Sequence, residues 1–174
     1  ELARFGASEV RAVLNDVVDI DGTRAWFERF QPEVVFHAAA HKHVPLMEDH
    51  PHEAIRNNVL GTVSVVDAAC DVGADRLVLV STDKAGEPSS VMGATKRIAE
   101  LYVRSRNAVD GAKPGTKCSL VRFGNVLGSS GSVLEVWQRQ VADGGPMTVT
   151  DPRMTRYFMT IPEAAGLVIG TATL

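Results

Sequence analysis

The stretch 77–100, LVLVSTDKAGEPSSVMGATKRIAE, constrains the fold more than any other part of the sequence. Its four apolar residues 77–80 have the length and β-branched content of a fully buried parallel strand. Polar residues 81–84 follow at the carboxyl end of that strand, and a Gly/Pro/Ser loop leads into a helix predicted over 92–107. Because ligands of open α/β sheets lie beyond the carboxyl ends of the strands, we expect a site here.

Strands and helices alternate along the rest of the chain. Strands are predicted over 10–14, 34–40, 77–80, 118–123 and 147–150, and helices over 23–30, 51–72, 92–107 and 132–142, with a last helix whose first residue is Pro162. Gly73 is expected to end the second helix, and 124–131 forms a glycine-rich loop. This alternation predicts one α/β domain with a mostly parallel, doubly wound sheet.

Composition excludes several classes of function. A length of 174 residues suits a single domain. The net charge of −3, without a dense basic run, argues against a nucleic-acid partner. The sequence contains no apolar run of membrane-spanning length. Cys70 and Cys118, far apart and each in an apolar run, favour a reducing compartment over a disulfide framework.

An acid beside an amine at a strand end suits proton transfer, since each tunes the pKa of the other. Asp83 and Lys84 form such a pair, but taken alone they are equally well interpreted as turn caps in a solvated ion pair. The five histidines cluster within 37–52, and two of them flank Lys42 in a His-x-His pattern. We favour a polar loop facing a ligand or water over a metal site, because no HExxH pattern is present and both cysteines are remote.

The combination of STDKA, VMGATK, HAAAHKHVP and RFGNVLGS resembles the nucleotide-sugar 4,6-dehydratases of the CapD-like polysaccharide-biosynthesis family, which are extended short-chain dehydrogenase/reductases. The resemblance covers residues 16–174. It implies a Rossmann-like domain that uses NAD or NADP and acts on a UDP-N-acetylhexosamine such as UDP-GlcNAc, in polysaccharide, capsule or lipopolysaccharide biosynthesis. A hydride leaves C4 of the sugar, a base removes the C5 proton, water is lost from C6, and the hydride returns to C6.

The resemblance also assigns catalytic roles. Lys84 is the base at C5, which requires a lowered pKa, and Asp83 is the acid at the C6 oxygen, which requires a raised pKa. Thr82 hydrogen-bonds near the C4 oxygen. Lys96 binds the nicotinamide ribose and lowers the pKa of the base that acts on the C4 hydroxyl.

The binding residues come from the same resemblance. The cofactor contacts implied are Asp16, Val17, Ala38, Ala39, Lys42, Asn58, Lys96 and Val126. The substrate contacts implied are Lys84, Asn125, Arg153 and Arg156, the two arginines being suited to a diphosphate. Taken without the resemblance, Asp16 fits a capping residue, Asn58 a helical Asn bonded to backbone, and the arginines fit surface charges almost equally well.

Two departures from the family pattern matter. Met92 stands where the superfamily has a catalytic tyrosine, and a thioether cannot accept the C4 hydroxyl proton. Methionine here is typical of the long, membrane-anchored branch, and it leaves Lys84, or Lys96 through water, as the C4 base. The glycine-rich GxxGxxG turn that holds the pyrophosphate is absent from the sequence.

We therefore expect residues 1–174 to be a partial NAD(P)-binding Rossmann-like domain, truncated at the N-terminus, with the start of the substrate-binding region from about 124. The isolated chain is expected to bind cofactor weakly and to be nearly inactive. The parent is expected to be anchored in the inner membrane with this domain in the cytoplasm, and a homo-oligomer is allowed. The alternatives are a non-catalytic nucleotide-binding module of the same fold and, less favoured, a metal enzyme built on the histidine loop.

Overall fold

The computed structural model describes residues 9–107, 115–129, 132–149 and 151–174. Its strands are β1 (Val34–His37), β2 (Arg76–Thr82), β3 (Lys117–Phe123), β4 (Asn125–Val126) and β5 (Phe158–Met159). Its α-helices are α1 (Ile20–Phe30), α2 (Val44–Asp49), α3 (Pro51–Ile55), α4 (Gly61–Asp71), α5 (Val91–Asn107), α6 (Val133–Ala142) and α7 (Ile161–Thr171). A π-helical turn, η2 (Arg56–Leu60), joins α3 to α4, and a 3₁₀ turn, η3 (Asp83–Ala85), follows β2.

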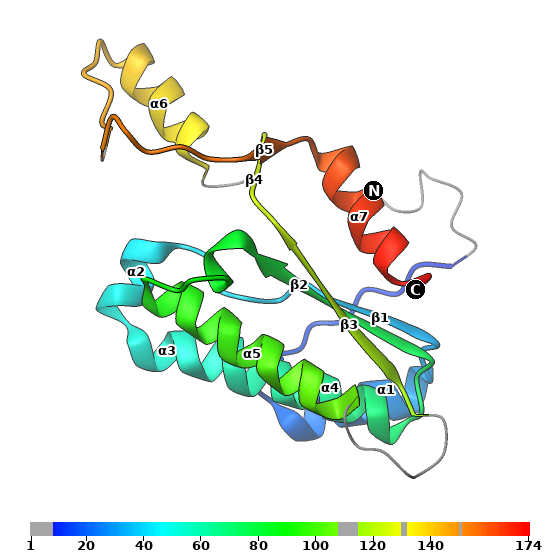
Figure 1. Ribbon diagram of the computed structural model, residues 1–174. Helices are drawn as coiled ribbons and strands as arrows, with labels where there is room; N and C mark the ends of the chain where they lie inside the picture. The colour runs from blue at the N-terminus through cyan, green and yellow to red at the C-terminus, as the bar shows by residue number, and fades with distance from the viewer. Residues whose placement is uncertain (1–8, 108–114, 130–131, 150) are drawn as a thin grey trace.

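The main sheet has three parallel strands in the order β1-β2-β3. Helices α4 and α5 cover one face, and α7 lies on the other, where it contacts β2 and β3 (Figure 1). Parallel strands covered by helices on both faces are typical of a Rossmann-like α/β sheet. The predicted Rossmann-like α/β fold is therefore confirmed.

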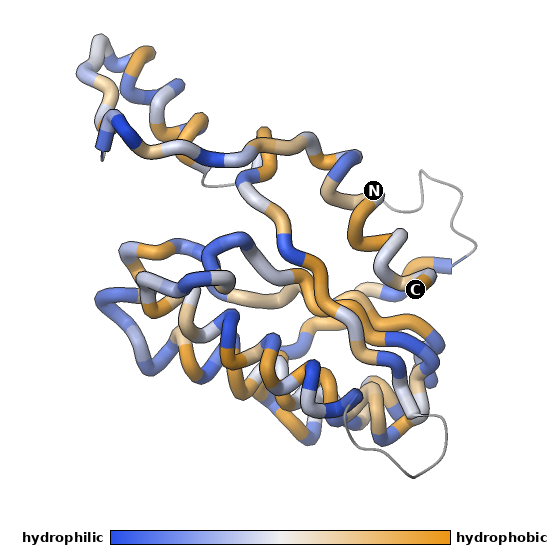
Figure 2. Tube along the Cα trace, viewed as in Figure 1, coloured by the Kyte–Doolittle hydropathy of each residue, from blue (hydrophilic) through white to orange (hydrophobic). Residues whose placement is uncertain are grey.

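The core lies between the sheet and the α4–α5 layer. Leu77 and Leu79 of β2 are 0% exposed and pack with Val66 of α4 and with Ala99 and Val103 of α5. The apolar strands stand out along the centre of Figure 2. Each buried Leu or Val stabilises the fold by about 1.5–3 kcal/mol, so this central strand holds the α5 helix against the sheet.

The helix ends follow their local sequence. Asp19 caps α1 by accepting from the Gly22 N–H at 3.0 Å. Gly73 has φ +72°, and the N–H groups of Gly73 and Ala74 bond back to α4, so the predicted glycine stop is confirmed. Helix α7 begins at Ile161 with Thr160 as N-cap, so Pro162 is its second residue rather than its first.

Two predicted strands are wrong. Residues 10–14 form no strand, and Leu14 is 101% exposed, because the described part of the chain offers no partner strand there. Residues 147–149 are not a strand either, and residue 150 lies outside the described residues. The backbone of Thr148 bonds instead to Trp137 and Gln140 of α6, and Gly144 and Gly145, both with positive φ, bring it there.

Other elements differ in extent. Strand β1 ends at His37 instead of 40, and the histidine-rich segment contains α2. The predicted helix over 51–72 is broken by η2. The predicted glycine-rich loop contains β4, which pairs in parallel with β5. After Phe123 the chain leaves the main sheet and forms β4 and α6 (Figure 1). A division into two regions near residue 124 stays a prediction.

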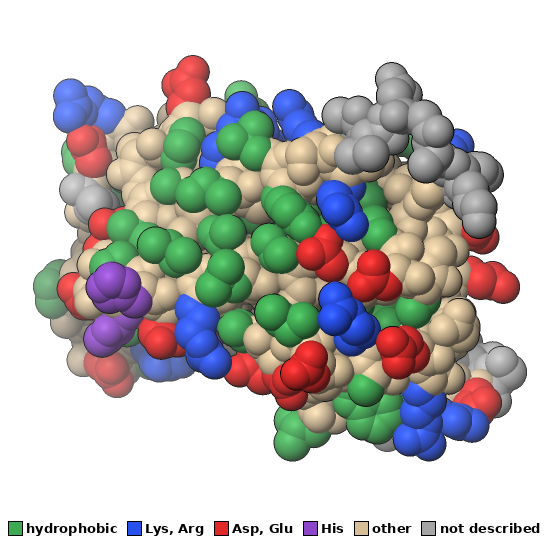
Figure 3. Space-filling view, turned by 90° about the horizontal axis from the view of Figure 1, so that it is seen from below, with side chains coloured by type: hydrophobic (Ala, Val, Ile, Leu, Met, Phe, Trp, Pro, Cys, Tyr) green, Lys and Arg blue, Asp and Glu red, His purple; other side chains and the backbone are tan. Residues whose placement is uncertain are grey.

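The outer face of the helix layer carries both charged and apolar side chains (Figure 3). Among its exposed large apolar residues are Ile55, Ile98 and Leu101, each about half exposed. Within the residues that the structure describes, no helix combines the length and apolar character needed to cross a membrane.

Candidate functional site

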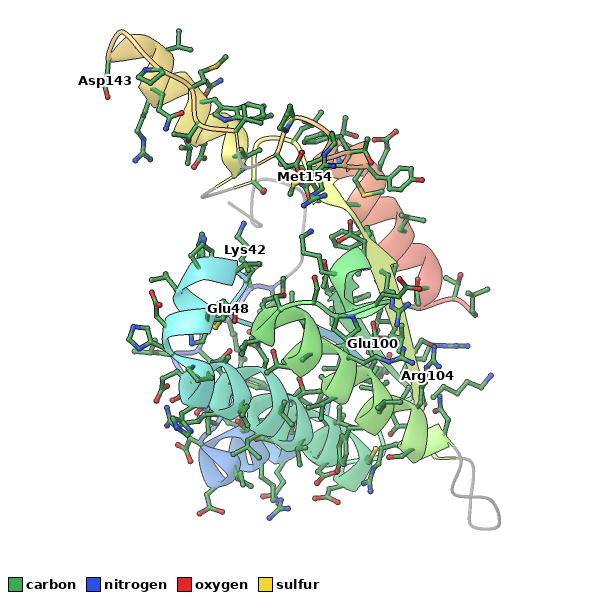
Figure 4. The ribbon with its side chains drawn as sticks, turned by 60° about the vertical axis from the view of Figure 1, so that its left-hand side comes forward. Lys42, Glu48, Glu100, Arg104, Asp143 and Met154 are labelled. Carbon is green, nitrogen blue, oxygen red and sulfur yellow. The ribbon has the colours of Figure 1, made fainter. Side chains whose placement is uncertain are left out.

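A cleft of about 540 Å³ opens at the carboxyl ends of the strands of the main sheet. Its walls come from the segment after β1, the end of β2, the start of α5, and the β4–α6 region. Figure 4 shows Lys42 projecting from the segment just before α2, on the side of this cleft. Of the residues predicted to act or bind, the cleft brings together Ala38, Lys42, Thr82, Lys84, Met92, Lys96, Asn125 and Val126. The site is thus at the sheet edge where the sequence places it.

The polar residues after β2 form one hydrogen-bonded group. The Lys84 ammonium lies 2.9 Å from Asp83 Oδ1 and 3.3 Å from Asn125 Oδ1. The Thr82 hydroxyl donates to Asp83 Oδ1 at 3.0 Å and accepts the Lys84 backbone N–H at 3.4 Å, which caps η3. Lys84 therefore bridges two segments that are 41 residues apart in sequence.

The expected raised pKa of Asp83 is wrong for this arrangement. Partial burial acts to raise the pKa of the Asp83 carboxyl, but hydrogen bonds from Lys84 and Thr82 and the Lys84 charge together lower it below its usual value. Asp83 also does not line the cleft itself and reaches it through Lys84. Its role as an acid stays a prediction, and it requires a proton on Asp83 that the ion pair with Lys84 disfavours.

Lys96 is a buried cation on the cleft wall. It is 8% exposed, and its ammonium donates to the backbone oxygen of Val80 at 2.8 Å. Burial lowers the pKa of Lys96 from 10.5 to about 8, against the opposing effect of the Glu100 charge. A cation of this kind, at the mouth of the strands, suits a ligand hydroxyl or phosphate.

His37, at the end of β1, lies below this wall. Its Nε2 is 3.0 Å from the Thr62 hydroxyl, which donates its own hydrogen to the Asn58 carbonyl. Nε2 must therefore carry the hydrogen of that contact. Burial and the Lys96 charge lower the pKa of His37 to about 4, so the ring is neutral at pH 7.

Met92 contributes a thioether to the cleft wall, at the position where the resemblance implies a tyrosine base. It is 4% exposed, lines the cleft, and packs with Met47 of α2 and Ala54 of α3. The next residue, Gly93, permits a close approach of α5 to η3, since a Cβ there would lie 2.6 Å from the Lys84 carbonyl oxygen. The sequence analysis did not identify this requirement, because it depends on the contact between two elements.

Asn58, which the resemblance implies as a cofactor contact, does not line the cleft and instead braces the segment after β1. Its Oδ1 accepts the His41 N–H at 2.7 Å, and its Nδ2 donates to the His41 carbonyl at 3.0 Å and to Thr95 Oγ1 at 3.1 Å. The side chain is 1% exposed and lies in the π-helical turn η2. Such turns occur frequently at functional sites, and this one aims Asn58 at α5 and the cleft wall together.

Five other predicted contacts do not line the cleft. Asp16 accepts from the Val18 N–H and forms an ion pair with Arg56 at 3.6 Å. Val17 lines a separate apolar hollow of about 410 Å³. Arg153 is 89% exposed and paired with Asp151 at 2.8 Å, and Arg156 contacts Met154 beside it. Ala39 does not line the cleft, whereas its neighbours Ala38 and Ala40 do.

Sequence reasoning missed the apolar part of the cleft. Phe123 at the end of β3, Leu134 of α6 and Phe158 of β5 also line it. The aromatic pair 157–158 directly follows Arg156 in the sequence, and it was the available signal for Phe158. Among the described residues, no three His, Cys, Asp or Glu side chains converge on a point that could hold a metal ion.

Comparisons with known proteins identify the family of this chain. The family model for "polysaccharide biosynthesis protein" matches residues 3–174. The capsular polysaccharide biosynthesis protein CapD of Staphylococcus aureus is 59% identical over 145 residues, which are 83% of this chain and 24% of that protein. An inverting UDP-N-acetylglucosamine 4,6-dehydratase of Campylobacter jejuni is 35% identical over 166 residues, which are 95% of this chain and 49% of that protein.

Among solved structures, Pen from Bacillus thuringiensis is 34% identical, with a TM-score of 0.90, and the match covers 98% of this chain and 52% of that one. This chain thus spans about half, or less, of the length of these relatives. The chain therefore belongs to the polysaccharide biosynthesis protein family, among relatives of CapD and of the UDP-N-acetylglucosamine 4,6-dehydratases.

Proposed function

We propose that this chain is part of an NAD(P)-dependent UDP-GlcNAc (UDP-N-acetylhexosamine) 4,6-dehydratase and contributes its catalytic residues. The enzyme would act in polysaccharide, capsule or lipopolysaccharide biosynthesis. The observation that carries the proposal is the single cleft that gathers Thr82, Lys84, Lys96 and Asn125. A dehydratase relative at 35% identity supports the reaction class. The proposal concerns the full-length protein, and the isolated chain is proposed to bind cofactor weakly.

The cleft fits a nicotinamide ring and its ribose. Ala38 and Ala40 leave room beside the backbone, Val126 offers an apolar surface, and Lys96 is a buried cation suited to ribose hydroxyls. A nicotinamide held beside Ala38, Ala40, Lys96 and Val126 would supply the hydride chemistry of the reaction, at C4 and C6 of the sugar. Whether the cofactor is NAD or NADP is decided by residues other than those that line this cleft.

The remaining steps belong to side chains of the turn after β2. With a 4-ketone in place, neutral Lys84 removes the acidified C5 proton. Protonated Asp83 then gives its proton to the C6 oxygen, which leaves as water with formation of a C5–C6 double bond. When hydride is added at C6, the Lys84 ammonium returns the proton to C5. Thr82 and Asn125 bind the sugar oxygens in this proposal. Thr82 also orients Asp83, and Asn125 orients Lys84, through the hydrogen bonds described above.

The Asp83–Lys84 ion pair is one proton transfer away from the state that these steps need. Moving a proton over the 2.9 Å contact from Lys84 Nζ to Asp83 Oδ1 makes the base neutral and the acid protonated at once. A bound sugar that excludes water disfavours the charged pair and promotes this transfer. The ion pair and the acid–base pair are then two protonation states of one arrangement.

A second function is favoured by Met92. Because a methionine lines the cleft where a tyrosine would act, the domain could bind a nucleotide sugar without turnover. We propose the enzyme as the better reading, with Lys84, or Lys96 through water, as the base at the C4 hydroxyl. Membrane anchoring of the parent in the long branch, a cytoplasmic site and a homo-oligomer are parts of the same proposal.

The test is a product assay on the full-length protein with UDP-GlcNAc and related UDP-sugars. We expect a 4-keto-6-deoxy product, abolished in Lys84→Ala and retained in Lys117→Ala, whose lysine is exposed at the start of β3. Full activity of Lys84→Ala would remove Lys84 from its role. Tight UDP-sugar binding without product would establish the binding module instead.

A further inference from the structure

Glu100 of α5 is a charged residue with no exposed surface. It lies one helical turn after Lys96 and is 0% exposed. Figure 4 shows it on α5, close to β3. A buried carboxylate is costly unless it is paired and hydrogen-bonded, so its partners carry information about its purpose.

Its partners are the ends of two neighbouring strands. Oε1 accepts from the Ser81 hydroxyl at 2.6 Å and from Arg122 Nε at 2.7 Å, and Oε2 accepts from Arg122 Nη2 and, at 3.2 Å, from Arg97. Burial acts to raise the pKa of Glu100, but the hydrogen bonds from Arg122 and Ser81 lower it on balance, so the carboxylate is ionised. Ser81 and Arg122 are cross-strand partners, and Glu100 thus ties β2 to β3 where the cleft begins.

The same network reaches the turn that holds the proposed acid and base. Arg122 Nη2 also donates to the carbonyl of Ala85, the last residue of η3, at 3.4 Å. Ser81 immediately precedes Thr82, and the residue before it, Val80, accepts the Lys96 ammonium. The carboxylate therefore has one hydrogen-bonded link to each side of the turn.

Glu100 also acts on Lys96 through its charge. The Lys96 ammonium faces His37 from β1 and shares the cleft with Lys42 and Lys84. Burial lowers the pKa of Lys96, and the Glu100 carboxylate opposes that effect. His37, with a pKa of about 4, is neutral in the range where Lys96 titrates.

We propose that Glu100 is a positioning residue that clamps the ends of β2 and β3, fixes the 83–85 turn through Arg122, and stabilises the Lys96 ammonium within the cleft. Its catalytic meaning rests on the proposed function, but the clamp itself does not. Lysine titration and amide signals measure it without turnover, so the failure of either proposal is recognised separately.

The test is nuclear magnetic resonance of the chain with ¹³C-labelled lysine side chains and ¹⁵N-labelled backbone. The chain has five lysines, and Lys96→Arg identifies the Lys96 signal. In Glu100→Gln we expect the titration midpoint of Lys96 to fall by about one pH unit, because an opposite charge nearby is lost. The amide signals of Asp83, Lys84 and Ala85 should shift as well.

Three further variants separate charge from geometry. Arg97→Gln removes a cation from the same carboxylate without touching the turn, so the amide signals of 83–85 should stay in place. Arg122→Lys keeps a cation but loses the fork that reaches both Glu100 and Ala85, so those signals should shift while Lys96 titrates nearly as before. Glu100→Asp should largely restore the Lys96 midpoint but not the turn signals.

An unchanged Lys96 midpoint in folded Glu100→Gln would overturn the electrostatic part of the proposal. If Glu100→Gln fails to fold, Arg122→Lys and Glu100→Asp decide. Turn signals identical to those of the parent chain in both variants would overturn the clamp.

Discussion

The bracing by Asn58 leads to a stability prediction that the structure makes quantitative. Asn58→Ala removes three hydrogen bonds, two to the backbone of His41 and one to Thr95. At about 1 kcal/mol of net stabilisation for each bond, the free energy of unfolding should fall by about 3 kcal/mol. For a chain of this size the melting temperature should fall by about 6–12 °C.

The neighbouring Asn57 offers a matched control in the same π-helical turn. Its side-chain oxygen is buried without a hydrogen-bond partner within the described part of the chain. Asn57→Ala should therefore change the free energy of unfolding by less than about 1 kcal/mol. Urea unfolding followed by circular dichroism measures both variants, and equal losses would refute the bracing role of Asn58.

The remaining predictions use the same unfolding measurement. Because His37 has a pKa of about 4 when folded and 6.5 when unfolded, the unfolded chain binds more protons between those values, and stability should fall by up to about 3 kcal/mol as the pH drops from 6.5 to 4. His37→Gln should lose much less over that range, and an equal loss would exclude His37 as the cause. Gly93→Ala should destabilise the chain by about 1–3 kcal/mol through its clash with the Lys84 carbonyl, whereas Gly166→Ala in α7, with open space around it, should stabilise it by up to about 1 kcal/mol. A neutral Gly93→Ala would show that η3 moves freely.

The central strand and the long α5 helix were predictable because their signals are local. The apolar run 77–80 leaves few alternative structures, and Leu77, Val78 and Leu79 are buried as predicted. The cleft followed from topology, since parallel strands put their carboxyl ends at one edge. The individual site residues were predicted from the family motifs, whereas the strands and helices were predicted from hydrophobic patterns.

The failures share a physical cause, which is dependence on a distant partner. The apolar residues 10–14 have strand propensity, but a strand requires a neighbour to bond with. Residues 147–149 have a neighbour, but it is the side of α6 that captures their backbone. The π-helical turn at Asn58 likewise depends on hydrogen bonds to His41 and Thr95. These partners are distant in the sequence, so no local pattern predicts the turn.

The Asp83 pKa shows the same dependence at the scale of one hydrogen bond. Sequence spacing places an acid beside an amine but does not state which of them holds the proton. The 2.9 Å contact with Lys84 lowers the pKa of Asp83, the reverse of what an acid needs. An acid role for Asp83 therefore depends on the proton transfer from Lys84 that we propose.

The Asp83–Lys84 pair also differs from a structural ion pair in its exposure to solvent. Both side chains are about one-third exposed, and a pair so placed contributes only about 0–1 kcal/mol to stability. Replacing Lys84 should therefore leave the unfolding transition almost unchanged while product formation is lost. Loss of Arg122 should behave in the opposite way, because its partner Glu100 is 0% exposed, and leaving a buried charge unpaired typically costs about 3–5 kcal/mol. In this site the partly exposed Asp83–Lys84 pair performs the proposed chemistry, and the buried Glu100 carboxylate holds the backbone in place. Stability and activity can therefore be perturbed independently.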